Sequence, residues 1–526
     1  MKKNNIFKVL TIAILISIVL SYFIPGTTMS YGSVEKGTII PVPFADVFTN
    51  GITSLSAFLT TFIYVLIIGA FYAILKKTNK YDALVNDVAV KFNKNKGAFI
   101  VLTVFVLGLV TIFTGEIYAM LIFVPFLISV IKKLGYSNET SIVSTVGAIL
   151  IGNAGSLYTY YANQMLSLTV SDNVLSKILV SLIGLVSLVA FVLVFGKKPN
   201  STKDLKKSNE RKMLPLHIIM WTMLVLLVLG FVNWAGYFNF TGFDTFLETL
   251  KSGKIAKVSV FDMFVGKTVV AFGNWQTFNA AVLFTFVSVL IALIYKVRIN
   301  DFFEGFAEGL KKAFPYAVIV VLANIVLVNV YSSGVFYTMV IGLTKKTVSL
   351  FTSTISSVLA AFFFPDYSYA TQFTLTGIMT TSAEKYESLF AITFQAVYSL
   401  FLLISPTSIL LLFGLKYNGV RYKDWIKYIY KYFIVLLVTL LVVITISVNG
   451  FSFASIVALV LLVIAVGIIV YLRIANATKV VDVNSAKVEK KEEVKKTPTK
   501  KTTNKKAPVK KTSSNKKTTT KKTNKK

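Results

Sequence analysis

Long apolar runs separated by basic loops constrain the fold of this chain more than any other feature of its sequence. Of its 526 residues, 55% are hydrophobic and only 15% are charged, and the mean hydropathy is +0.71. Many of the runs are as long as a helix that crosses a bilayer, and a soluble domain has no interior large enough to bury them all. The sequence therefore predicts an all-α polytopic membrane protein.

Two of the apolar regions are interrupted by polar residues. In the first, Phe99 to Met165, a hairpin turns at Thr114-Gly115-Glu116 and the next helix breaks between Gly152 and Ser156. In the second, a hairpin turns at Pro365 to Ser368 and the next helix breaks at Ser405-Pro406-Thr407-Ser408. Irregular backbone at bilayer depth is tolerated only where protein buries it or where it lines a cavity. Because the arms of the first hairpin are shorter than the ~20 residues of a spanning helix, we expect two re-entrant hairpins, each followed by a broken helix.

Clusters of lysine and arginine set the expected orientation of the chain. Cytoplasmic loops of membrane proteins are rich in these residues, and such clusters occur at 76–96, 197–212, 296–312 and 416–427. We expect about ten spanning helices, plus the two re-entrant hairpins and the two broken helices. We predict a multi-pass protein of a bacterial plasma membrane with its N- and C-termini in the cytoplasm.

The two halves of the chain align with opposite orientation. Each contains a span, an amphipathic connector, a span, a hairpin, a broken helix and a further span, and the connectors FADVF and FFEGF are alike. Inverted repeats with broken helices that meet at the bilayer midplane are the architecture of secondary transporters. The expected parts are a first inverted repeat (1–200), a linking span and external segment (201–275), a second inverted repeat (276–450), a last span (451–478) and a lysine-rich tail (479–526).

The tail differs in composition from the rest of the chain. From Lys487 to Lys526 it contains seventeen lysines and three glutamates, and it has no aromatic residue. Such a segment cannot bury a core, so we predict a disordered cytoplasmic tail. It is either simply solvated or attracted to anionic lipid headgroups, and no specific nucleic acid is predicted as a partner.

Several classes of chemistry find no support in the sequence. There is no cysteine for a disulfide or a thiolate-bound metal, and the single histidine, His217, stands at the start of an apolar helix as an interfacial residue. No HExxH, GxSxG or P-loop pattern occurs. We therefore predict that the protein is not an enzyme and that it needs no cofactor, apart from Na⁺ or H⁺ as a coupling ion.

Three stretches carry a family resemblance: VLIIGA at 65–70, the return arm Glu116 to Gly135, and ISPTS at 404–408 followed by YKDW at 422–425. On these stretches, in this order, the chain resembles the YfcC-like carriers of the ion-transporter superfamily, which are related to anaerobic dicarboxylate carriers and aminobenzoyl-glutamate transporters. The resemblance covers roughly residues 5 to 450. It implies an alternating-access carrier of the elevator type or a related one, often a homodimer, with its site between hairpin tips and helix breaks.

Eight polar residues at the tips and breaks are candidates for substrate binding: Glu116, Asn153, Ser156, Asp366, Gln372, Ser405, Thr407 and Ser408. Two carboxylates at membrane depth can bind a cationic group, carry a proton, or hold sodium together with backbone carbonyls. Alternatively, each acid only caps a helix N-terminus, and the other residues only satisfy backbone groups freed at the breaks. Gln372 is a weaker candidate than the others, as are Gln395 and Asn324, because a single polar residue on a membrane helix often just bridges neighbours.

The expected charge of the site suggests a substrate. In the pattern of the resembled family an arginine stands where this chain has Asn324, and the second tip is rich in proline, serine and glycine where this chain has Asp366. These departures make the site more negative, so we predict a secondary transporter of a small amino acid, an antiporter of the arginine/ornithine type. The alternatives are a sodium- or proton-coupled (di)carboxylate transporter and a non-transporting membrane scaffold that acts through its basic tail.

Overall fold

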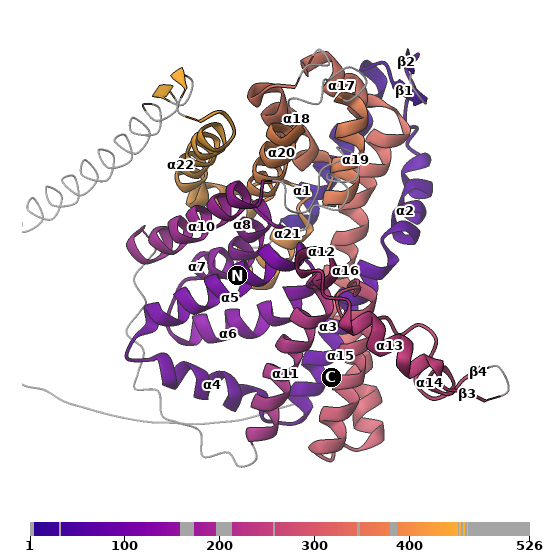
Figure 1. The fold of residues 1–526 in the computed structure, drawn as a ribbon, viewed down its shortest axis with the longest axis vertical. Helices are drawn as coiled ribbons and strands as arrows, with labels where there is room; N and C mark the ends of the chain where they lie inside the picture. The colour runs from indigo at the N-terminus through magenta and orange to yellow at the C-terminus, as the bar shows by residue number, and fades with distance from the viewer. Residues whose placement is uncertain are drawn as a thin grey trace, which may run out of the picture. The chain divides into compact units, whose positions relative to one another are not determined.

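The computed structural model describes residues 5–30, 33–157, 173–195, 213–255, 258–344, 348–378, 387–450, 452–453, 456–457 and 460. Nearly all of the described chain is helical (Figure 1). Two short antiparallel pairs, β1 (Thr27–Ser30) with β2 (Ser33–Lys36) and β3 (Lys254–Ile255) with β4 (Val258–Ser259), lie in loops. The lysine-rich tail and most of the expected last span fall outside the described residues.

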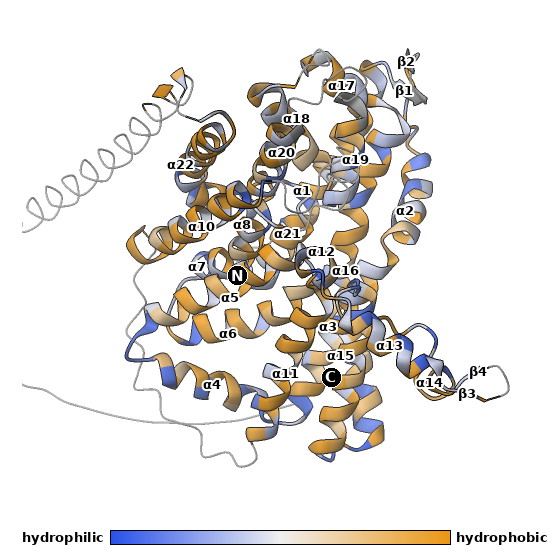
Figure 2. Ribbon diagram, in the orientation of Figure 1, coloured by the Kyte–Doolittle hydropathy of each residue, from blue (hydrophilic) through white to orange (hydrophobic). Residues whose placement is uncertain are grey.

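Eight described helices are long and apolar enough to cross a membrane. They are α1 (Ile6–Phe23), α3 (Leu59–Lys77), α5 (Lys96–Thr114), α10 (Val174–Ala190) with its π-helical extension η3 (Phe191–Phe195), α11 (Leu214–Phe231), α15 (Thr277–Ile294), α16 (Ile299–Ser332) and α22 (Tyr422–Asn449). Figure 2 shows these helices as mainly apolar, with hydrophilic residues gathered near helix ends and on α4 and α13. The prediction of an all-α polytopic membrane protein is confirmed.

Shorter helices connect these eight. They are α2 (Asp46–Ala57), α4 (Tyr81–Phe92), η1 (Ala119–Phe123), α6 (Val124–Lys133), α7 (Asn138–Ile142), η2 (Val143–Gly147), α8 (Ala148–Ala154), α12 (Trp234–Phe238), α13 (Gly242–Ser252), α14 (Val260–Phe264), α17 (Val335–Thr344), α18 (Leu350–Phe363), α19 (Tyr367–Ile378), α20 (Glu387–Phe401) and α21 (Ile409–Asn418). Of these, η1 is a 3₁₀-helix and η2 is a π-helix.

The two hairpins differ in the length of their arms. The first rises through the 19 residues of α5, turns at Gly115, and returns through η1 and α6. Its rising arm is longer than the sequence suggested, because helical hydrogen bonding begins at Lys96, before the apolar run. The second hairpin has arms of 14 and 12 residues, α18 and α19, both too short for a straight span. The re-entrant arrangement stays a prediction.

The second broken helix is interrupted where the sequence predicted it. Helix α20 ends at Phe401 and α21 begins at Ile409, with Ser405-Pro406-Thr407-Ser408 in the non-helical segment between them. Pro406 has no N–H, and its ring disfavours a helical conformation for the residue before it. In the first broken helix the interruption comes later than expected, since α8 continues through Gly152 and Asn153 to Ala154. Residues 158–172 lie outside the described part.

The described helices pack in two groups. In group one, α3 packs against α15 and α16, and α16 also packs against α1 and α2. In group two, α8 packs against α5, α10 and α20, while α20 also contacts α18 and α22, and α10 contacts α22. Helices α4, α11 and α17 contact members of both groups, α16 of group one also contacts α18 of group two, and α21 contacts α1 and α16 of group one.

Small residues bring the central helices of each group into close contact. A Cβ atom at Gly69 of α3 would lie 2.3 Å from the Cβ of Ala313 on α16, and one at Gly309 would lie 2.5 Å from the Cα of Ala70. A Cβ at Gly152 of α8 would lie 2.5 Å from the carbonyl oxygen of Gly108 on α5. Small side chains let membrane helices approach backbone to backbone. The contact between Gly152 and Gly108 joins the first broken helix to the rising arm of the first hairpin.

Candidate transport site

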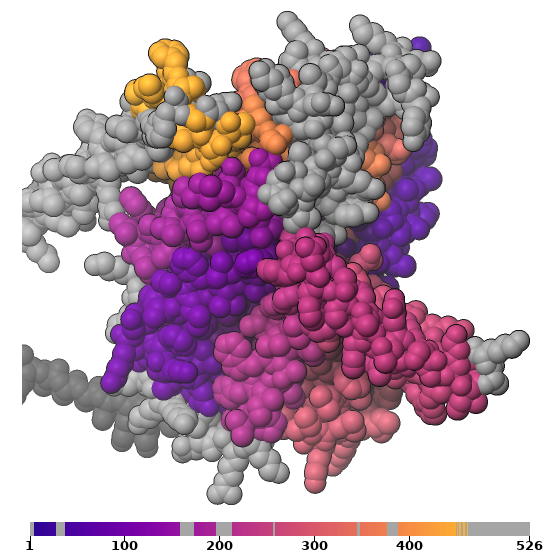
Figure 3. Space-filling model, viewed as in Figure 1, coloured from indigo at the N-terminus to yellow at the C-terminus, as the bar shows by residue number. Residues whose placement is uncertain are grey.

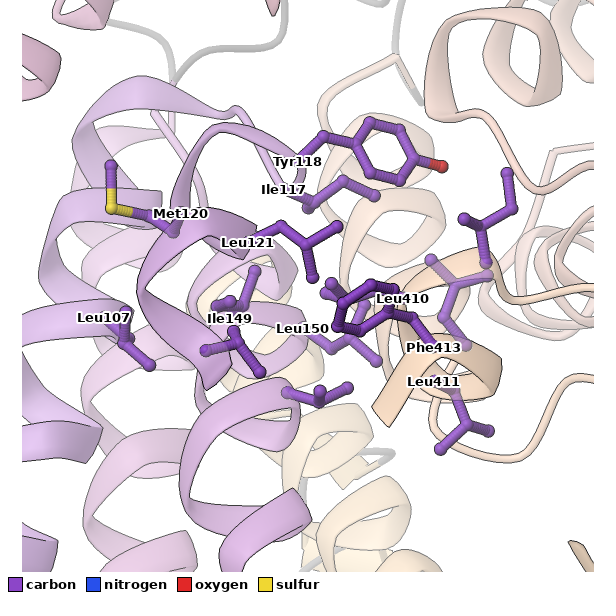
Figure 4. Packing of buried hydrophobic residues seen from close by; sticks show 14 of the residues in the cluster. Leu107, Ile117, Tyr118, Met120, Leu121, Ile149, Leu150, Leu410, Leu411 and Phe413 are labelled. Carbon is purple, nitrogen blue, oxygen red and sulfur yellow. The ribbon is translucent and has the colours of Figure 1, made fainter. Parts of the chain in front are cut away.

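The tips of the two hairpins touch each other. The hydroxyl of Tyr118, next to the first turn, donates a hydrogen bond to the carbonyl oxygen of Pro365 at 3.2 Å. Figure 4 shows the Tyr118 ring pointing away from the first-half ribbon with its hydroxyl outermost. The carboxylates of Glu116 and Asp366 are both half-buried and lie close enough to interact electrostatically. The structure therefore brings together the two acids that the sequence placed at the tips.

The first tip presents Glu116 from a tight turn. Gly115 ends α5 in the left-handed conformation, φ 67°, which glycine adopts at no steric cost. Its N–H donates to the carbonyl of Thr111 at 2.8 Å, and the Glu116 N–H donates to the Thr114 hydroxyl at 3.3 Å. The backbone of the turn is thus satisfied locally. In the described part of the chain, no group donates a hydrogen bond to the Glu116 carboxylate itself.

The second tip holds Asp366 differently. Its Oδ1 accepts hydrogen bonds from the backbone N–H groups of Ser368 at 2.9 Å and Tyr369 at 3.2 Å. This is the geometry of a helix N-cap, and Asp366 directly precedes α19. The capping role that the sequence left open for this residue is therefore present, next to Glu116.

Buried tyrosines fix both hairpins, and the sequence analysis missed them. From α3, the hydroxyls of Tyr64 and Tyr72 donate to the carbonyls of Ala119 at 2.7 Å and Ile122 at 2.6 Å, which holds the 3₁₀ return arm η1. From α20, the Tyr398 hydroxyl donates to the carbonyl of Phe364 at 2.8 Å. All three tyrosines are buried, Tyr64 and Tyr398 completely. Their position inside apolar runs, away from the helix ends where anchoring tyrosines stand, was the available signal.

The first break is stabilised by the other half of the chain. Gln395 of α20 donates from Nε2 to the carbonyls of Asn153 at 3.0 Å and Ser156 at 2.8 Å. In return, the Asn153 amide donates to the Ser399 hydroxyl at 2.7 Å. The Leu157 N–H donates to the carbonyl of Ile112 in α5 at 2.8 Å, which places the break beside the first hairpin. Asn153 and Ser156 are thus brought together with α20.

The second break is stabilised from within its own half. The Thr407 hydroxyl donates to the carbonyl of Phe362 in α18 at 2.9 Å, and the Thr407 N–H donates to the Ser405 hydroxyl at 3.1 Å. The freed carbonyls of Leu403 and Ile404 accept from side chains of α22, Trp425 Nε1 at 2.7 Å and the Tyr422 hydroxyl.

Comparison with known proteins assigns the family. A sequence model of the C4-dicarboxylate anaerobic carriers matches residues 6–449. The chain belongs to this family. The resemblance found in the sequence is confirmed, and the protein is a secondary carrier. No curated protein matches the carrier. Among solved structures, the YdaH transporter of Alcanivorax borkumensis, whose crystal structure is described as revealing an unusual topology, is 12% identical with a TM-score of 0.40; the match covers 85% of the carrier and 98% of that chain.

The remaining candidates differ in burial and in whether their polar atoms have hydrogen-bond partners. The Ser408 hydroxyl of the carrier is buried at the second break, and within the described residues it has no hydrogen-bond partner. The same holds for Oε1 of Gln395 and Oδ1 of Asn324. Buried polar atoms in native proteins are nearly always paired, so these oxygens are available to a ligand or to water. Gln372 is exposed on α19, outside this buried set, and its role stays a prediction.

Lys177 is a buried cation that the sequence analysis did not single out. It lies on the first turn of α10, is only 2% exposed, and is the one lysine or arginine that is buried among the described residues of the carrier. Its backbone carbonyl closely approaches Gly155 of the first break. A charged residue buried in an apolar helix is expensive and is therefore a functional candidate. The available signal was a lysine three residues into an apolar run.

Apolar side chains from both halves surround these polar groups. Leu121 and Leu150 from the first half belong to the same buried cluster as Leu410 and Phe413 from the second (Figure 4). Such packing excludes water and lowers the local dielectric constant, which strengthens any charge interaction inside it.

Proposed function

We propose that the carrier exchanges small amino acids, of the arginine/ornithine type, by alternating access. The observation that carries this proposal is the pair of acids, Glu116 and Asp366, at touching hairpin tips. Two carboxylates that interact electrostatically in a poorly hydrated site favour a positive group between them. An ammonium or guanidinium group of the substrate supplies that charge.

The pattern of helix contacts supports inverted repeats behind this mechanism. The contact of α5 with α8 in the first half has its counterpart in α18 with α20, and the contact of α8 with α10 has its counterpart in α20 with α22. Three further contacts join equivalent helices to each other: α8 with α20, α10 with α22, and α3 with α16. Paired contacts together with contacts between equivalent helices are expected around a two-fold axis. Equivalent helices meet each other across the axis, and a contact away from the axis occurs once in each repeat. Inverted repeats of this kind provide two alternating states.

The division of the helices into two groups supports a mechanism in which one group moves and the other stays fixed. Both hairpins' first arms and both breaks belong to group two, together with α10 and α22. Group one contains the closely packed pair α3 and α16, joined through Gly69 and Gly309. We infer that group one is the scaffold and that group two carries the substrate, as in an elevator. The basic loops favour cytoplasmic termini in a bacterial plasma membrane.

Counterflow in proteoliposomes tests the substrate. Purified carrier is reconstituted into vesicles loaded with arginine, ornithine or lysine, and uptake of labelled arginine is compared with uptake into vesicles loaded with citrate or succinate. Trapped cationic amino acid is expected to accelerate uptake, because exchange lets the loaded site return. If only the carboxylates support flux, the amino acid proposal is wrong.

A second candidate is a sodium- or proton-coupled carrier of (di)carboxylates. The description of its family favours it, and so does Lys177, buried at the first break, because a buried lysine can pair with a substrate carboxylate. The acids at the tips then hold the coupling cation. Uptake of labelled succinate that requires an inward sodium or proton gradient supports this candidate, and gradient-independent exchange excludes it. Family membership disfavours the third alternative, a non-transporting scaffold.

A further inference from the structure

An apolar groove of about 560 Å³ lies between α4, α5, α6 and α11, away from the candidate transport site. Its walls include Leu84, Phe99, Val106, Phe126 and Leu224. Figure 3 shows α11, in magenta, lying against the purple surface of the α4–α6 region. The volume is within the range of about 300–1,000 Å³ that is usual for small-molecule sites.

The groove opens toward the surface that meets the bilayer. Two residues of its rim are substantially exposed, Leu102 at 44% and Trp221 at 63%. Both stand on helices long and apolar enough to cross a membrane, α5 and α11. A large apolar side chain on such a helix contacts lipid, so a lipid acyl chain has direct access to the groove.

Ionisable side chains line only one end of the groove. Asp87 and Lys91 come from the second half of α4, and His217 comes from the first turn of α11. Lys94 follows in the connection to α5, and Lys96 is the first residue of α5. Together these residues give that end an excess of positive charge beside apolar walls, as expected for a phosphate headgroup attached to an acyl chain.

A buried hydroxyl on the groove wall points to a further contact. Thr103 lines the groove and is 2% exposed, and its Oγ1 has no hydrogen-bond partner within the described residues. Leaving a buried hydroxyl unpaired is unfavourable. Thr103 is seven residues after Lys96 on α5, which places it about 10 Å further along the helix at ~1.5 Å per residue. A hydrogen-bond acceptor on a molecule in the groove would satisfy it.

We propose that the groove binds an anionic glycerophospholipid from the surrounding bilayer. The acyl chain packs against the apolar walls, an ester carbonyl accepts a hydrogen bond from Thr103 Oγ1, and the phosphate lies at Lys91 and His217. Helix α4 joins α3 of group one to α5 of group two. A lipid seated against α4 therefore contacts the connection between the two groups.

Lipid retention by the purified full-length carrier tests the proposal. In native mass spectrometry, wild-type carrier is expected to retain phosphatidylglycerol over phosphatidylcholine with the same acyl chains. Lys91→Gln is expected to reduce this preference roughly fivefold, since one lysine near an anionic surface contributes ≈1 kcal/mol. The matched control, Lys311→Gln, removes an exposed lysine of α16 that does not line the groove and leaves the preference unchanged. Equal retention of both lipids by the wild type, or equal losses in both variants, would overturn the proposal.

Fluorescence provides a second measurement that keeps the groove intact. Trp221 lines the groove, so phosphatidylglycerol brominated on its acyl chains is expected to quench the wild-type carrier more than brominated phosphatidylcholine does. The difference should disappear in Trp221→Phe, which keeps an aromatic ring at the rim. If both brominated lipids quench the wild type equally, the groove has no preference for an anionic lipid and the proposal is wrong.

Discussion

Each hairpin tip presents one acid, but the hydrogen bonds made to the two carboxylates differ. At the second tip, two backbone N–H groups at the start of α19 compensate the charge of Asp366. At the first tip, no described group hydrogen-bonds the carboxylate of Glu116, which follows a left-handed glycine. An acid therefore caps a helix at one tip, whereas the acid at the other tip has no hydrogen-bond donor among the described residues. We infer that Glu116 is the principal binding charge and that Asp366 combines two roles.

The two helix breaks differ in a similar way. The carbonyls of Asn153 and Ser156 at the first break accept from Gln395 of the opposite half. The carbonyls at the second break accept from α22 of the same half. The first break thus depends on the contact between α8 and α20, whereas the second is stabilised by a neighbour in its own repeat. The contacts pair as in a two-fold arrangement, but the hydrogen bonds do not.

Removing the charge at the first tip gives the largest expected effect. Glu116→Gln should lower amino acid exchange at least ~100-fold, because losing one partner of a desolvated charge pair costs about 3 kcal/mol or more. Because the carboxylate makes no described hydrogen bond, the melting temperature of the purified carrier should stay unchanged. Counterflow and a thermal melt on the same preparation measure both quantities.

The matched control for this variant is Glu308→Gln. Glu308 is an exposed acid on α16 that pairs with Lys312 one turn away, and surface pairs of this kind contribute little. It should keep normal exchange. Normal exchange by Glu116→Gln would remove this residue from the site and contradict the proposed difference between the tips.

Two substitutions separate the roles of Asp366. Asparagine caps helices as well as aspartate does, so Asp366→Asn should preserve stability while lowering exchange by about tenfold if the charge also binds substrate. Asp366→Ala should lose the cap as well, at about 1 kcal/mol of stability. Thermal melts and counterflow distinguish the outcomes. If Asp366→Asn exchanges normally, the residue is only a cap.

The sequence predicted those features that depend on local composition. Apolar runs identified the membrane class, the acids marked both tips, and Ser405-Pro406-Thr407-Ser408 located the second break, because a proline and small polar residues act on their own backbone. The first break was placed too early. Gly152 and Asn153 are residue types that often end a helix. Helix α8 nevertheless continues through them, because Gly152 packs directly on Gly108 of α5.

The remaining features depend on residues far apart in the chain. Gln395 was rated only a weak candidate, because nothing in its neighbourhood shows that α20 lies against the first break 239 residues away. The YKDW stretch at 422–425 was identified only through the family resemblance. The structure supplies its physical reason: Trp425 and Tyr422 satisfy the carbonyls of the second break. Such pairings follow from packing, which periodicity along the sequence does not encode.

Substitution of Gln395 tests whether the first break depends on the opposite half. Gln395→Leu leaves the carbonyls of Asn153 and Ser156 without their shared donor, so stability should fall by about 2 kcal/mol. The control on the same helix is Thr393→Val, which removes a buried hydroxyl that has no partner among the described residues and should be neutral or slightly stabilising. Denaturation of the purified carrier measures both. Equal effects of the two variants would show that the hydrogen bonds of Gln395 contribute nothing.

The smallest effect is expected at the second break. Tyr422→Phe removes only the hydroxyl that donates to Ile404, so stability should fall by about 1 kcal/mol, the net contribution of one hydrogen bond. The Leu403 carbonyl keeps its donor, Trp425, so the break retains part of its support from α22. The control is Tyr430→Phe, at an exposed tyrosine of the same helix, which should change nothing. If Tyr422→Phe lowered stability as much as Gln395→Leu does, the two breaks would be equally stabilised. The difference in their hydrogen bonds would then have no effect on stability.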